Sequence, residues 1–155
     1  MPIDFSEAGP PGDEDSLSST ERKIGLALPG DYRGFLAERN GGFLETSGFF
    51  DEHVVVEELF SAGPTPVRNL DQIEVMYERY AGPGSDQGLP PFLIPAGADP
   101  LGNLICVSAD DADGGLVYFW DHELVEEAHR SLDVDFQTFM ERLQPGERGE
   151  VPADP

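Results

Sequence analysis

The sequence has 155 residues, the usual size of one domain, and 39% of them are hydrophobic, which is enough to form a core. It carries 31 acidic residues against 9 basic ones, a formal net charge of −22. A surface this negative repels the phosphates of nucleic acids and anionic lipids, so we expect no direct binding to nucleic acid and no membrane binding. It attracts a basic protein partner and speeds its association, although the same acidity can also serve solubility alone.

The only cysteine, Cys106, excludes an intramolecular disulfide and lies in an apolar run, which indicates a buried thiol and not a nucleophile. The N-terminus has neither the basic region nor the apolar region of a signal peptide. No stretch approaches the roughly 18 apolar residues that a membrane span needs. We therefore expect a cytoplasmic protein.

The first third of the chain predicts two helices. Residues 1–14 are expected to form a strand or a loop, because Gly, Pro and acidic residues gather there. A helix follows from about residue 15 to residue 27, where residues 18–21 match a capping box, and Pro29 breaks it. A second helix covers residues 31–39, and its apolar face is formed by Tyr32, Phe35 and Leu36. Gly41 and Gly42 are expected to end it.

The remainder predicts strands between two helices. One strand is expected near residues 54–56, and Asn69 is expected to cap a helix that carries Leu70, Ile73, Tyr77 and Tyr80 on one face. Three apolar runs with short polar links then indicate an antiparallel meander over residues 92–96, 104–107 and 116–120. A closing amphipathic helix is expected over residues 133–143.

This order of elements predicts an α+β fold, an antiparallel sheet of about four to six strands with helices packed around it. We expect residues 15–144 to form a single domain. Residues 145–155 are expected to form a flexible acidic tail, because Gly, Pro and acidic residues dominate there.

The motifs that usually carry chemistry are incomplete here. Residues 110–114 resemble part of a calcium loop, but the first and twelfth positions of that loop would be Ala109 and Trp120, which supply no oxygen ligand. The three histidines lack the spacing of a zinc site, and no serine stands in a nucleophile elbow. We therefore predict no catalytic residue, no cofactor and no metal.

Three segments are candidates for contact with a partner. Two aromatic residues next to two acidic ones have the composition of a binding hot spot against a basic surface, although the core is the default place for the aromatic rings. An acidic loop and the polar end of a strand are the other two candidates. The predicted partner-binding residues are Phe49, Phe50, Asp51, Glu52, Asp110, Asp111, Asp113, Asp121, His122 and Glu123.

The order and spacing of several motifs resemble the SUKH superfamily, the Smi/Knr-like proteins. Its opening signature is matched by Glu21, Ile24-Gly25, Leu28-Pro29-Gly30-Asp31-Tyr32, Phe35-Leu36 and Asn40-Gly41-Gly42. Residues 94–103 are similar to its central hairpin, residues 115–123 to its next strand, and Phe136, Phe139 and Leu143 to its closing helix. The resemblance covers about residues 15–144.

The resemblance implies a twisted antiparallel sheet surrounded by helices. It also implies a role, since many bacterial members are immunity proteins of polymorphic toxin systems that bind a toxin domain, whereas fungal members are regulatory scaffolds. We therefore predict a non-enzymatic immunity protein that binds and neutralises a basic toxin, for instance a nuclease, as a monomer or a weak homodimer. The alternatives are a regulatory or scaffold protein of the same fold, and a small-ligand binder or enzyme.

Overall fold

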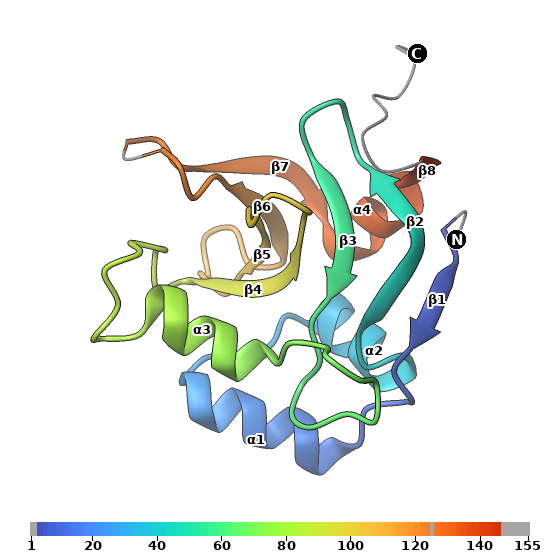
Figure 1. Cartoon of the computed structure of the whole chain (residues 1–155). Helices are drawn as coiled ribbons and strands as arrows, with labels where there is room; N and C mark the ends of the chain where they lie inside the picture. The colour runs from blue at the N-terminus through green and yellow to red at the C-terminus, as the bar shows by residue number, and fades with distance from the viewer. Residues whose placement is uncertain (1–2, 125, 147–155) are drawn as a thin grey trace.

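The sheet of this protein is antiparallel and strongly curved (Figure 1). The computed structural model describes residues 3–124 and 126–146. Seven strands pair in chain order from β1 to β7, and β8 pairs with β2. The bounds are β1 Phe5–Ala8, β2 Gly42–Phe49, β3 Val55–Leu59, β4 Leu93–Ala98, β5 Leu104–Ser108, β6 Leu116–Trp120, β7 His129–Asp135 and β8 Gln144–Gly146. The predicted α+β class is confirmed, and the eight strands in the part of the chain that the structure describes exceed the four to six that were expected.

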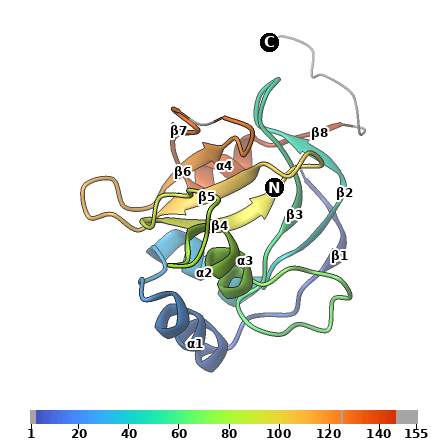
Figure 2. The same cartoon turned by 60° about the vertical axis from the view of Figure 1, so that its left-hand side comes forward.

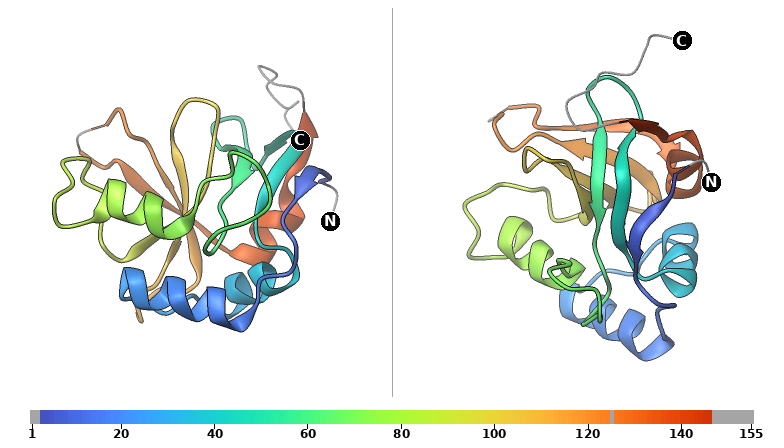
Figure 3. Two further views of the ribbon diagram at one scale, coloured as in Figure 1. Left: turned by 60° about the horizontal axis from the view of Figure 1, so that its bottom comes forward. Right: turned by 45° about the vertical axis from the view of Figure 1, so that its right-hand side comes forward.

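Within the described residues, four helices pack on this sheet and on each other: α1 Glu14–Ile24, α2 Gly30–Glu38, α3 Ile73–Ala81 and α4 Phe136–Arg142. Helix α3 lies between α1 and β4, as Figures 1 and 2 show. Its Tyr80 ring packs edge-to-face with the Trp120 ring on β6, with centroids 5.5 Å apart. Helix α4 contacts α2, β6 and β7 (Figure 3). Among the described residues, no helix is long and apolar enough to cross a membrane.

The closing helix was expected to begin at residue 133, but α4 begins at Phe136, three residues later. Residues 133–135 belong to β7, where Leu132 and Val134 alternate with exposed residues. The carboxylate of Asp135 accepts a hydrogen bond from the Thr138 N–H at 2.8 Å, so Asp135 caps α4 and is not part of it. This hydrogen bond holds the pKa of Asp135 below its ordinary value.

Two predicted helix caps are also wrong. Asp13 caps α1 by accepting from the Ser16 N–H at 2.7 Å, so residues 18–21 form no capping box. Glu21 instead accepts from the Leu28 N–H at 2.8 Å and contacts Arg33 at 3.3 Å, which ties α1 to α2. Helix α3 starts after Gln72, while Asn69 has a positive φ of 67° in the preceding connection.

Gly42 begins β2 and Gly41 directly precedes it, so neither ends α2, which is capped by Arg39. A Cβ atom on Gly41 would lie 2.6 Å from the Leu59 carbonyl oxygen, and its φ is 80°. Glycine is required there because the backbones of β2 and the end of β3 approach closely. The prediction that this pair ends the helix is therefore wrong.

The core confirms that Cys106 is a buried thiol. Both Cys106 and Tyr32 are almost fully buried, and burial raises the pKa of each group far above its ordinary value. The ring of Tyr32 packs on Phe136, with centroids 4.8 Å apart, which joins α2 to α4 inside this core.

The two end segments contribute strands. Residues 5–8, within the predicted N-terminal segment, pair with β2 as strand β1. Residues 145 and 146 belong to β8. The remainder of the predicted tail, residues 147–155, lies outside the described residues, and the single-domain span 15–144 stays a prediction.

Candidate partner-binding site at one end of the sheet

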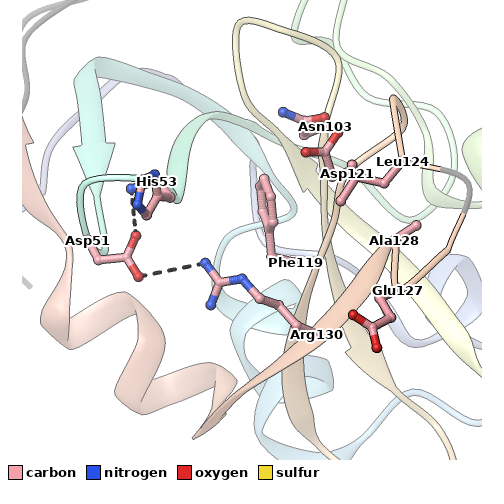
Figure 4. A pocket seen from close by; sticks show the side chains of 9 residues that line it. All are labelled: Asp51, His53, Asn103, Phe119, Asp121, Leu124, Glu127, Ala128 and Arg130. Carbon is pink, nitrogen blue, oxygen red and sulfur yellow. Dashed lines mark hydrogen bonds and ion pairs between the residues drawn. The ribbon is translucent and has the colours of Figure 1, made fainter.

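Three connections between strands meet at one end of the sheet. They are residues 50–54 between β2 and β3, residues 99–103 between β4 and β5, and residues 121–124 and 126–128 between β6 and β7. In an antiparallel sheet, every second connection lies at the same end of the sheet. The pairing of Glu58 on β3 with Ala98 on β4 places the β2–β3 connection on the same side as the β4–β5 and β6–β7 connections. They surround a hollow of about 480 Å³ lined by Asp51, His53, Asn103, Phe119, Asp121, Leu124, Glu127, Ala128 and Arg130, here called the sheet-end hollow (Figure 4).

Asp51 shapes the β2–β3 connection. One carboxylate oxygen accepts hydrogen bonds from the backbone N–H groups of His53 and Val54, both at 2.8 Å. The other lies 3.9 Å from the guanidinium of Arg130, so Asp51 links the β2–β3 connection to strand β7 (Figure 4). The neighbouring Glu52 is exposed, and its carboxylate lies 3.3 Å from the His53 ring.

The two aromatic residues of this hairpin pack inward. Phe49 is 4% exposed, and the half-buried ring of Phe50 stacks on Phe139 of α4 with centroids 5.1 Å apart. The structure therefore places both rings in the packing of the molecule. Asp51 and Glu52 are the members of this segment that reach the surface.

A chain of hydrogen bonds fixes the β4–β5 turn against the β6–β7 connection. The Asp99 carboxylate accepts from the N–H of Leu101 and from both the N–H and the side-chain amide of Asn103, at 2.8–2.9 Å. Oδ1 of Asn103 accepts from the His122 N–H at 3.2 Å and lies 2.8 Å from its Nδ1. In the same connection, Asp121 accepts from the Glu123 N–H at 3.0 Å. Hydrogen bonds therefore hold the predicted residues Asp121, His122 and Glu123 in place.

The hollow combines apolar and charged groups. The ring of Phe119 lies in the middle of the hollow, with the Arg130 guanidinium 5.7 Å from its centroid (Figure 4). Leu101 and Leu124, which are 76% and 51% exposed, stand on the surrounding connections. Exposed leucines beside charged groups suit contact with a protein surface.

The predicted acidic loop lies at the opposite end of the sheet, between β5 and β6. Asp113 accepts from the Ser108 hydroxyl at 2.7 Å and from the Tyr118 hydroxyl, and these bonds lower its pKa. The same contact with Asp113, together with burial, raises the pKa of Tyr118 to about 12. Asp110 accepts from the Ala112 N–H at 2.9 Å, and Asp111 is exposed. The predicted residues thus form two groups and not one surface.

The sequence analysis missed seven of the nine residues that line the hollow: His53, Asn103, Phe119, Leu124, Glu127, Ala128 and Arg130. The predicted meander contained a usable signal, because it places residues 99–103 and the residues after Trp120 at one end. Strand β2 was not recognised, so the hairpin could not be placed beside them. In the part of the chain that the structure describes, no three His, Cys, Asp or Glu side chains are grouped to hold a metal ion, and metal-free function stays a prediction.

Comparison with known proteins gives the family. The model of the SMI1 / KNR4 family (SUKH-1) matches residues 11–144. The chain belongs to this family. The SPbeta prophage-derived uncharacterized protein YokK of Bacillus subtilis (strain 168) is 30% identical to this SUKH-1 protein over 124 residues, which covers 71% of this chain and 62% of that relative. No solved structure matches the chain. The resemblance to the SUKH superfamily is therefore confirmed.

Proposed function

We propose that this SUKH-1 protein is an immunity protein that binds and neutralises a basic toxin without converting a substrate. The observation that carries the proposal is the SUKH-1 match over residues 11–144, because the immunity role is common among bacterial members. The net charge of −22 supports a basic partner. A nuclease toxin fits this chemistry, since an enzyme that acts on a polyanion presents a basic cleft.

Neutralisation by binding requires an affinity of about 1 nM or tighter, roughly −12 kcal/mol. Attraction between charges speeds the encounter but rarely supplies this free energy alone, so apolar contacts must contribute. Leu124, which lines the sheet-end hollow, and Leu101, which is exposed on the neighbouring β4–β5 connection, offer such contacts. The hydrogen bonds from Asp99 and Asn103 hold these connections in place before binding, which lowers the entropy lost in the complex.

The function is tested by capture and rescue. The tagged protein is incubated with an extract of its native host at low salt, and each captured protein is expressed in a test cell with and without it. We expect a captured basic protein that stops growth alone and is harmless together with the SUKH-1 protein. If no captured protein is toxic, or if toxicity persists at equal expression, the proposed function is wrong.

The role of the hollow is tested in the same complex. Replacing both exposed leucines, Leu101→Ser with Leu124→Ser, should weaken the affinity for the toxin by about tenfold or more, because their apolar area then stays in water. The matched control is Val75→Ser on α3, a comparably exposed apolar residue outside the hollow, which should leave the affinity unchanged. Equal affinities of all three proteins, measured by calorimetry, would remove the hollow from the contact surface.

A further inference from the structure

A second concave surface lies between α2 and α4. It has a volume of about 510 Å³ and is lined by Asp31, Gly34, Phe35, Glu38, Phe136, Gln137, Met140 and Glu141, here called the α2–α4 groove. The two helices are joined beneath it by the edge-to-face contact of Phe35 with Phe136, with centroids 5.0 Å apart. Oδ2 of Asp31 accepts from the Gln137 N–H at 3.1 Å, which fixes the start of α4 against α2. Strand β7 connects the two surfaces, because Arg130 lines the hollow and Phe136 follows the end of that strand.

Gly34 is unexplained by the fold itself. It lies in the middle of α2, where glycine is less stable than alanine by about 1 kcal/mol. A Cβ atom built on Gly34 meets no atom within 4 Å, and the residue does not have a positive φ. Neither crowding nor backbone conformation therefore requires glycine there. A glycine on an open groove wall leaves room for another backbone to approach closely.

The charged residues that line the groove, among those that the structure describes, are all acidic. The carboxylates of Asp31, Glu38 and Glu141 line it, and within residues 3–124 and 126–146 no basic side chain does. Glu38 and Glu141 are exposed, whereas Asp31 bonds to α4. Phe35 adds a half-buried apolar surface between them. The groove therefore presents an apolar floor with negative charge beside it.

We infer that the α2–α4 groove binds a positively charged amphipathic helix of the partner protein, an inference that rests on the proposed function. An amphipathic helix lays apolar side chains into such a groove, and its Lys and Arg residues meet the carboxylates of Glu38 and Glu141. Helix α2 is about 13 Å long, so the groove accommodates roughly two turns of the bound helix. A second copy of this chain is disfavoured as the occupant, because two molecules of charge −22 repel each other.

A peptide probe tests the groove without a toxin. The full chain, labelled with ¹⁵N, is titrated with a synthetic helix of about 15 residues in which Leu recurs at i, i+3 and i+4 and the other face carries Lys and Arg. We expect chemical shift changes concentrated on α2 and α4, and none with a peptide whose basic residues are replaced by Glu. Shift changes centred on the sheet-end hollow, or spread over the whole surface, would overturn the inference.

Variants of the groove sharpen this test. Gly34→Trp fills the space beside α2 and should weaken peptide binding by about tenfold or more, whereas Gly34→Ala adds a single methyl group where the peptide backbone approaches and should weaken binding by a smaller factor. Should Gly34→Trp fail to fold, the double variant Glu38→Lys with Glu141→Lys takes its place and should weaken binding by about tenfold or more as well. Glu78→Lys, an exposed acidic residue on α3, is the control for charge alone. Equal binding by Glu78→Lys and the double variant would contradict a defined site.

The captured toxin separates the two proposals. If wild type binds and neutralises a toxin while Gly34→Trp and the double variant do so equally well, the proposed function stands and the groove inference fails. If no toxin is found but the basic peptide binds the groove as described, the groove stands as a docking surface and its assignment to a toxin fails with the proposed function.

Discussion

The sheet-end hollow and the α2–α4 groove are similar in volume but differ in how their acidic residues are used. In and around the hollow, Asp51 and Asp99 accept hydrogen bonds from the backbone of their own connections, and Asp51 also approaches Arg130. In the groove, Glu38 and Glu141 are exposed residues of helices α2 and α4.

This difference shows that the number of acidic residues alone does not identify a surface for a basic partner. A carboxylate that already accepts backbone hydrogen bonds has less capacity left for a partner cation, and its removal is expected to disturb the fold. A carboxylate on an exposed helix face retains that capacity. The hollow is thus suited to apolar contact on a rigid frame, and the groove to the binding of positive charge.

The largest effect on stability is expected at the frame of the hollow. Asp99→Ala removes three hydrogen bonds to Leu101 and Asn103 and should lower the free energy of unfolding by about 1–3 kcal/mol. Glu141→Ala, in the groove, should change it by less than about 0.5 kcal/mol. Urea unfolding of both variants measures this contrast. Equal losses would mean that the carboxylates of the two surfaces do not differ in role.

A gain in stability is expected in the groove. Gly34→Ala should raise the free energy of unfolding by about 0.5–1 kcal/mol, because alanine favours the helix and its Cβ meets no atom within 4 Å. Thermal unfolding followed by circular dichroism measures the gain. A destabilised Gly34→Ala protein would show that the fold itself requires this glycine, and the groove would lose one of its supports.

The smallest effect concerns the acidic loop at the other end of the sheet. Hydrogen bonds from Tyr118 and Ser108 hold the pKa of Asp113 below its ordinary value. The ionised carboxylate of Asp113 therefore stabilises the fold at pH values above its ordinary pKa, and this stabilisation is lost as the pH falls through the lowered pKa. Tyr118→Phe removes the first of these bonds, so the pKa of Asp113 should rise. Carbon-13 NMR titration of the Asp113 carboxyl follows this directly, and an unchanged midpoint would contradict the structural role of Asp113.

The parts of the fold that follow from sequence are those with strong apolar patterns. The meander β4 to β6 and helices α1 to α3 were predicted because their buried residues recur at regular spacing. Strand β2 was missed because Gly42, Gly48 and three polar residues interrupt its pattern. Strand β7 was partly assigned to a helix, since Val134, Phe136, Phe139 and Met140 follow each other closely at its junction with α4. The edge strands β1 and β8 are too short to give a pattern.

The candidate surfaces were harder to predict than the fold. Composition suggested Asp51, Glu52 and the residues 121–123, and topology brings them to one end of the sheet. The sequence alone could not show that Phe49 is buried, nor that the Asp113 carboxylate accepts a hydrogen bond from Tyr118. Phe35 and Phe136 were each expected on the apolar face of their own helix. Their meeting to form a groove depends on the packing of segments about 100 residues apart in sequence.

The most direct test of the account is a titration of toxin activity. A fixed amount of the captured toxin is mixed with increasing amounts of the SUKH-1 protein, and the residual activity is measured at once and after prolonged incubation. Inhibition by binding predicts a linear fall that reaches zero at one equivalent and does not change with time. Complete inactivation by a small fraction of an equivalent, progressing with time, would show that the protein acts as an enzyme and would contradict the account.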